Sequence, residues 1–142
     1  INATAAVNAA VGYTAGSLGT QTYKGWTSSG AINGVVNEGA TATSAINISS
    51  SGTLEFALVK INMSHTQPSE MGMRLVSPSG TEATILQPYT ALNVNPNTYI
   101  YLAANAFYGE SMAGNWTLRL FDHDTNGTQM LLRDWSISFY HR

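Results

Sequence analysis

Apolar and polar residues alternate with a period of two in several short stretches of the chain, each bounded by turn-forming residues. In the segment 71–76, methionine and leucine side chains share one face, whereas Arg74 lies on the other. This alternation is typical of a β-strand with one buried face. The same pattern predicts strands over 45–48, 54–63, 71–76, 81–86, 99–102, 116–120 and 135–139. Their number and spacing indicate an all-β fold, an antiparallel jelly-roll-like β-sandwich.

The longest predicted strand, 54–63, changes phase at its middle. Its apolar residues occupy even positions as far as Leu58 and odd positions from Val59 onward. Such a change indicates either a β-bulge or a central strand that is buried on both faces. In the last two strands, Trp116 and Trp135 fall on the apolar face, so we expect both indoles to anchor the core.

The N-terminal part of the chain has a different pattern. Between Asn2, a favourable N-cap residue, and Gly12, a favourable C-terminal stop, apolar residues recur at helical spacing. The segment 13–34 is rich in glycine and has no sustained period, which is typical of a linker. We therefore expect a helix at 1–12, a Gly-rich linker at 13–34 and a β-domain at 35–142.

Composition and charge exclude several functional classes. Only 10% of the residues are charged and the formal net charge is −2, with the basic residues scattered singly. A nucleic-acid-binding protein needs a basic stripe, so we expect no nucleic-acid partner. No apolar run approaches the length of about 20 residues that a membrane-spanning helix requires. The chain has no cysteine, which excludes disulfides and thiolate metal sites within it.

Catalytic motifs are absent from the sequence. No G-x-S-x-G segment surrounds a serine, and no H-x-x-x-H pair provides zinc ligands. His65 is explained by packing and turn bonding. We therefore expect that this chain is not itself an enzyme.

The segment 122–127, Asp-His-Asp-Thr-Asn-Gly, matches the opening of a calcium-binding loop. Asp122, Asp124 and Asn126 place oxygen ligands at alternate positions, which suits a hard cation. Arg133 stands where an EF-hand requires Glu, so a complete EF-hand is excluded. Two interpretations remain open. The segment is a polar turn, or it is a partial calcium site completed by a distant carboxylate, for which Glu110 is the candidate.

Three ordered blocks of residues carry a more specific signal. The first holds Ile61, His65, Glu70-Met71 and Ser77-Pro78-Ser79-Gly80-Thr81; the second holds Gly109-Glu110, Gly114, Trp116-Thr117-Leu118, Leu120 and Asp122; the third is Gly127 followed by 134–140. Together they resemble the P domain, or Homo B domain, of kexin-like proteases and proprotein convertases in the subtilisin family. The helix at 1–12 is similar to the last helix of subtilisin-like catalytic domains, which precede P domains. Members often carry Pro-Asp where this chain has Asn37-Glu38.

The resemblance implies a non-catalytic module of a secreted subtilisin-like serine endopeptidase, of bacterial origin. It implies that the partner is the catalytic domain of the same polypeptide, whose folding, stability and regulation the module supports. We expect a monomer that docks on this domain through an apolar patch, with calcium as the one candidate cofactor. The alternative is a carbohydrate- or surface-binding β-sandwich of another secreted enzyme.

Overall fold

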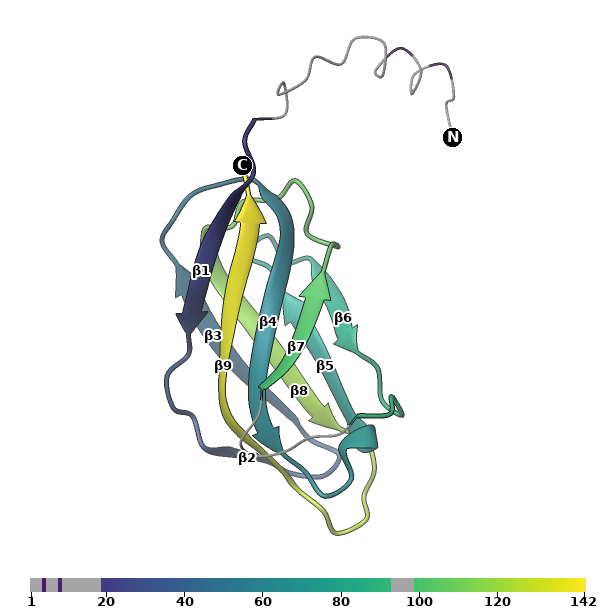
Figure 1. Cartoon of the computed structure of the whole chain (residues 1–142). Coiled ribbons are helices and arrows are strands. Elements are labelled where there is room, and N and C mark those ends of the chain that lie inside the picture. The colour runs from purple at the N-terminus through teal and green to yellow at the C-terminus, as the bar shows by residue number, and fades with distance from the viewer. Residues whose placement is uncertain (1–3, 5–7, 9–18, 93–98) are drawn as a thin grey trace.

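The protein is a β-sandwich of two sheets that pack face to face (Figure 1). The computed structural model describes Thr4, Asn8 and residues 19–92 and 99–142. Within these residues the strands are β1 (Thr22–Ser28), β2 (Gly34–Val36), β3 (Thr41–Ile48), β4 (Leu54–Ser64), β5 (Met71–Val76), β6 (Glu82–Leu86), β7 (Tyr99–Ala104), β8 (Gly114–Asp122) and β9 (Met130–His141). One sheet has the order β1-β9-β4-β7, with β2 also paired to β9, and the other has the order β3-β8-β5-β6. The pairs between these strands are antiparallel, so the predicted fold class is confirmed.

The predicted strands all exist, and most are longer than the sequence indicated. The strand 71–76 is β5 residue for residue, whereas 116–120 and 135–139 are the middles of β8 and β9. The added ends contain polar residues that break the alternation. They are strand because neighbouring chains pair with them, which a single segment cannot reveal.

β4 contains a β-bulge, but it lies near the start of the strand and not at the middle, where the sequence placed the phase change. The pairing of β4 with β9 shifts between Leu54 and Phe56, and from Ala57 onward the odd positions face the core. The bulge turns Phe56 to the outer face of the sheet, where its ring stacks on Tyr140 with centroids 4.6 Å apart. β4 is central in its sheet, but its outer residues are only partly buried, so the alternative of burial on both faces is wrong.

The linker predicted over 13–34 is wrong from Thr22 onward. β1 occupies residues 22–28 and pairs along the edge of β9, so the sandwich begins well before residue 35. The register shifts between Lys24 and Thr27, and this irregularity removes the period that would have marked a strand. Most of the helix predicted at 1–12 lies outside the described residues.

The core lies between the two sheets and is anchored by the two predicted tryptophans. Neither Trp116 nor Trp135 exposes any surface. The Trp116 ring contacts Phe107 edge-on at 5.0 Å and Phe139 at 5.1 Å, and its Nε1–H donates to the Met112 carbonyl at 2.9 Å. No helix in the described part of the chain is long and apolar enough to cross a membrane.

Candidate functional site

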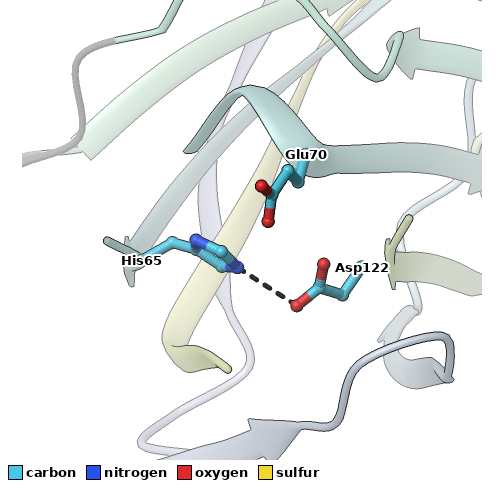
Figure 2. Close-up of side chains that lie close together, drawn as sticks. All are labelled: His65, Glu70 and Asp122. Carbon is cyan, nitrogen blue, oxygen red and sulfur yellow. Dashed lines mark hydrogen bonds and ion pairs between the residues drawn. The ribbon is translucent and has the colours of Figure 1, made fainter. Parts of the chain in front are cut away.

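Polar residues of the first two sequence blocks lie at the two ends of a pair of neighbouring strands. β5 and β8 run antiparallel in the middle of the second sheet, with Met71 opposite Asp122 and Val76 opposite Thr117. At one end, the segment entering β5 carries His65 and Glu70 and meets Asp122, the last residue of β8 (Figure 2). The other end joins the turn after β5 to the loop before β8. β8 spans about 26 Å, so these ends are separate sites.

A histidine and two carboxylates converge at the first end. His65 Nε2 lies 3.1 Å from Asp122 Oδ2, and neither side chain has exposed surface. One ligand atom from each of His65, Glu70 and Asp122 lies within 4.8 Å of the other two. Figure 2 shows the Glu70 carboxylate pointing toward the gap between the other two side chains. We call these three residues the acid–histidine cluster.

Backbone bonding fixes the tautomer of His65. The N–H of Gln67 donates to His65 Nδ1 at 2.8 Å, so Nδ1 is an acceptor and carries no proton. A neutral imidazole has one N–H, which must then lie on Nε2 and donate to Asp122 Oδ2. His65 therefore holds the carboxylate of Asp122 in place and presents no free nitrogen lone pair to the cluster.

The loop between β8 and β9 wraps around Glu70. Asn126 Nδ2 donates to Glu70 Oε1 at 2.6 Å, and Thr128 Oγ1 lies 3.5 Å from Glu70 Oε2. A backbone hydrogen bond also connects this loop to Glu70, since the N–H of His123 donates to the Glu70 carbonyl at 3.1 Å. Glu70 exposes only 4% of its surface. Its carboxylate thus has neutral partners and no cationic one among the described side chains.

Two buried carboxylate oxygens at this end have no hydrogen-bond partner. They are Asp122 Oδ1 and Glu38 Oε1. Glu38 forms a parallel bridge with Asp122, and the N–H of the next residue, Gly39, donates to the Asp122 carbonyl at 3.1 Å. Residues paired in this way place their side chains on the same face of a sheet. A buried anionic oxygen without a partner is costly, so this end of the fold has unmet acceptor capacity.

The structure brings together only part of the calcium site predicted from sequence. Asp122 and Asn126 both contact Glu70, a residue that the loop motif does not contain. Asp124 instead points outward, with its carboxylate 40% exposed, and accepts a bond from Tyr89 Oη at 2.8 Å. That hydrogen bond, with smaller effects of burial and charge, raises the pKa of Tyr89.

Glu110 lies at the opposite end of β8 and does not complete the predicted loop. Ser79 Oγ donates to its carboxylate at 2.6 Å, while Ser79 in turn accepts from Ser77 Oγ at 2.9 Å. Burial alone would raise the pKa of Glu110, but the hydroxyl groups of Ser77, Ser79 and Thr81, of which Ser79 donates to the carboxylate directly, outweigh it and lower this pKa. The N–H of Leu54 also donates to the Glu110 carbonyl at 2.8 Å. This end is a closed hydrogen-bond network that clamps a turn to a loop.

The fold is similar to that of several solved structures. A crystal structure of a serine protease of Aeromonas sobria aligns with 96% of this chain and 29% of its own, at a TM-score of 0.83 and 18% identity. The structure of the same protease with the chaperone ORF2 aligns equally well. The structure of FLHE aligns with 87% of this chain at a TM-score of 0.63 and 13% identity. At these identities the likeness concerns the fold alone.

Comparisons of sequence are more specific. The chain is 30% identical over 89 residues to furin-like protease 1 of Drosophila melanogaster, and 28% identical over 92 residues to the extracellular serine protease of Aeromonas sobria. These matches cover 61% and 56% of this chain, but only 7% and 15% of the two relatives. The profile of the proprotein convertase P-domain matches residues 54–139, well over half of the chain. The chain belongs to the proprotein convertase P-domain family.

Proposed function

We propose that this chain is the non-catalytic P domain of a longer subtilisin-like serine endopeptidase. On this proposal it supports the folding, stability and regulation of a catalytic domain in the same polypeptide. The observation that carries the proposal is the family match over residues 54–139, which falls on an intact sandwich. The chain corresponds to a small part of two protease relatives, which leaves ample length for a catalytic domain elsewhere.

The geometry of the buried histidine supports a non-catalytic role. In a Ser-His-Asp triad, the acid holds Nδ1–H and Nε2 faces the nucleophile. Here Nε2 of His65 is bonded to Asp122, and Nδ1 accepts from the backbone of Gln67. Neither nitrogen is left to take a proton from a serine.

The outer face of the sheet β1-β9-β4-β7 is the surface that we propose for docking. The rings of Tyr23 and Tyr140 lie 5.0 Å apart, and Trp26 contacts Tyr101 at 6.1 Å. Lys60 Nζ lies between the Trp26 and Tyr99 rings, 5.0 and 4.9 Å from their centroids. Tyr101 is 67% exposed. We call this surface the aromatic face; exposed apolar patches of this kind mark interaction sites.

Linkage gives the expected size of the effect. A domain that binds only the native catalytic domain stabilises it by RT ln(1 + C/Kd), where C is the effective concentration of the tethered domain and Kd is its dissociation constant. Tethered domains reach effective concentrations on the order of 1 mM. If docking has a dissociation constant of about 10 μM, the stabilisation is about 2.7 kcal/mol.

The test is to express the parent polypeptide with and without residues 22–142. We expect the truncated form to yield less mature protease and to unfold at a lower temperature. Tyr101→Ser then tests whether the aromatic face docks on the catalytic domain. Tyr89→Ser, elsewhere on the surface, is the control. Equal maturation and equal melting of the intact and truncated proteins would refute the proposal.

The name of the Aeromonas sobria relative, an extracellular protease, supports secretion of the parent enzyme. Its bacterial origin and the monomeric state of the module stay predictions. The exposed tyrosines of the aromatic face also suit the stacking of sugar rings, which is the observation that favours the alternative of a carbohydrate-binding module. A pull-down of the chain on insoluble polysaccharides, repeated with Tyr101→Ser, separates this function from docking.

A further inference from the structure

We propose that the carboxylates of Asp122 and Glu70 bind one Ca²⁺ ion at the end of the sandwich where β5 begins and β8 ends. His65 acts as a positioning residue that holds Asp122, not as a ligand. This inference does not depend on the proposed function, because it concerns residues within this chain and is tested on the chain alone.

Asp122 provides the first and strongest argument. Its side chain has no exposed surface, and Oδ2 is fixed by the Nε2–H of His65, yet Oδ1 has no partner. The group is therefore held rigidly with one anionic oxygen unused. Oδ1 belongs to the carboxylate that Figure 2 shows facing Glu70. A cation in this gap satisfies the oxygen whose burial is otherwise costly.

Glu70 provides the second carboxylate. Its carboxylate lies within ligand reach of Asp122 and receives only neutral donors, from Asn126 and Thr128. Asn126 is not counted as a ligand, because its amide nitrogen faces Glu70 and its side-chain oxygen accepts from the N–H and the hydroxyl of Thr128. Glu38, whose backbone pairs with Asp122, also has a buried oxygen without a partner, but its carboxylate is not one of the three groups that lie within ligand reach of one another. In the described part of the chain, neither Asp122 nor Glu70 forms an ion pair with Lys or Arg.

The histidine tautomer selects calcium over zinc. Zinc would take an imidazole nitrogen as a ligand, but Nδ1 of His65 accepts from Gln67 and Nε2 carries the proton. Placing a metal on Nε2 would move the proton to Nδ1, where it would face the Gln67 N–H. The oxygens that remain are the ligands of a hard cation. Ca²⁺ accepts six to eight oxygens in irregular geometry, whereas Mg²⁺ gives up its water reluctantly and is less suited to a buried site.

The experiment measures cation binding to the isolated chain after treatment with a chelator. Calcium chloride is titrated calorimetrically, and thermal unfolding is followed with and without calcium, magnesium or zinc chloride. We expect one Ca²⁺ per chain, with a dissociation constant of about 10⁻⁴ to 10⁻³ M, the range of extracellular calcium modules. We also expect a rise of several degrees in the melting temperature with Ca²⁺ and a smaller one with Mg²⁺. Absence of calcium binding, or binding of zinc alone, overturns the proposal.

Matched variants locate the ion. Asp122→Asn and Glu70→Gln keep the size of each side chain and remove its charge, and each is expected to weaken calcium binding at least tenfold. The control is Asp124→Asn, the same chemical change two residues away on an exposed carboxylate, which should leave the affinity unchanged. If Asp124→Asn weakens binding as much as Glu70→Gln, the ion sits in the exposed loop and the proposal is wrong. If Asp122→Asn fails to fold, the calcium affinity of Glu70→Gln, compared with that of Asp124→Asn, is the test.

The role of His65 has its own readout. His65→Gln retains an N–H that can donate to Asp122, whereas His65→Leu does not. We expect both variants to melt at a lower temperature, but only His65→Leu to bind calcium severalfold more weakly than the parent chain. Equal affinities in the two variants would show that His65 is structural only and does not position a ligand.

Discussion

Trp116→Phe is the substitution that tests most directly how the core is held. The change removes the indole nitrogen and part of the ring, while it retains an aromatic ring between Phe107 and Phe139. The Nε1–H donates to the carbonyl of Met112, a residue that is only 1% exposed, so the substitution leaves a buried acceptor without its donor. That loss costs about 1–3 kcal/mol. The smaller ring also leaves a cavity, which adds about 1–2 kcal/mol.

The predicted cost of Trp116→Phe is therefore about 2–5 kcal/mol, and a domain of this size should melt at a temperature lower by roughly 5–15 °C. The assay is urea unfolding followed by far-ultraviolet circular dichroism, which does not depend on the lost fluorophore. The control is Trp26→Phe, at a half-buried ring on the aromatic face, for which we expect a cost below about 1 kcal/mol. If Trp116→Phe costs no more than Trp26→Phe, the buried hydrogen bond and the close packing do not carry the stability assigned to them.

Three further predictions concern the hydrogen-bond network at the other end and the aromatic face. Because its pKa is lowered in the fold from an ordinary value of 4.5, Glu110 contributes stability above that pH and loses it as the pH falls through the lowered pKa. Unfolding free energies measured from pH 7 to pH 3 should thus show Glu110→Gln less stable than the parent at neutral pH and converging with it in acid; a constant difference would contradict the argument. Gly114→Ala should cost about 2 kcal/mol or more, because Gly114 has a φ of +123° and an added Cβ would lie 2.6 Å from Cβ of Pro78. Thermal unfolding measures this cost, with Gly25→Ala, where no atom lies within 4 Å of the new Cβ, as the comparison. Tyr101→Ser should leave the melting temperature of the isolated chain within about 2 °C of the parent, because this ring is largely exposed; a larger loss would show that the aromatic face is part of the fold and not a free surface.

The sequence predicted the sheets well because alternation reports burial directly. Strand β5 and the inward positions of Trp116 and Trp135 follow from the period of two. β1 was not predicted because its register shifts between Lys24 and Thr27. The even positions face one side of the sheet before the shift and the other side after it, so no regular alternation runs through the strand. The strand exists through its pairing with β9, a long-range interaction that leaves no local signal.

The candidate site was only partly predictable for a related reason. The loop motif at 122–127 indicated a hard cation, but a motif read along one segment selects neighbours in sequence, such as Asp124. Pairing of β5 with β8 instead brings Glu70 to Asp122, although the two lie 52 positions apart in the sequence. The signal that would have found Glu70 was present, since His65, Glu70 and Asp122 all belong to the blocks that resemble the P domain.

The two ends of the β5–β8 pair differ in a way that bears on why these blocks have their residues. At the end with Glu110, the polar groups of the chain bond to one another. The N–H of Thr81 donates to the hydroxyl of Ser77, this hydroxyl donates to Ser79, and the Ser79 hydroxyl donates to the Glu110 carboxylate. Folding alone accounts for every group in that series. At the other end, His65 fixes Asp122 in a position where one of its oxygens is left without a donor. A rigidly held, unsatisfied anion is of no use to folding by itself, so its presence argues for a positively charged ligand. An ion bound there would join the entry of β5 to the end of β8, and its loss would loosen that end of the sandwich while the Glu110 end stayed closed.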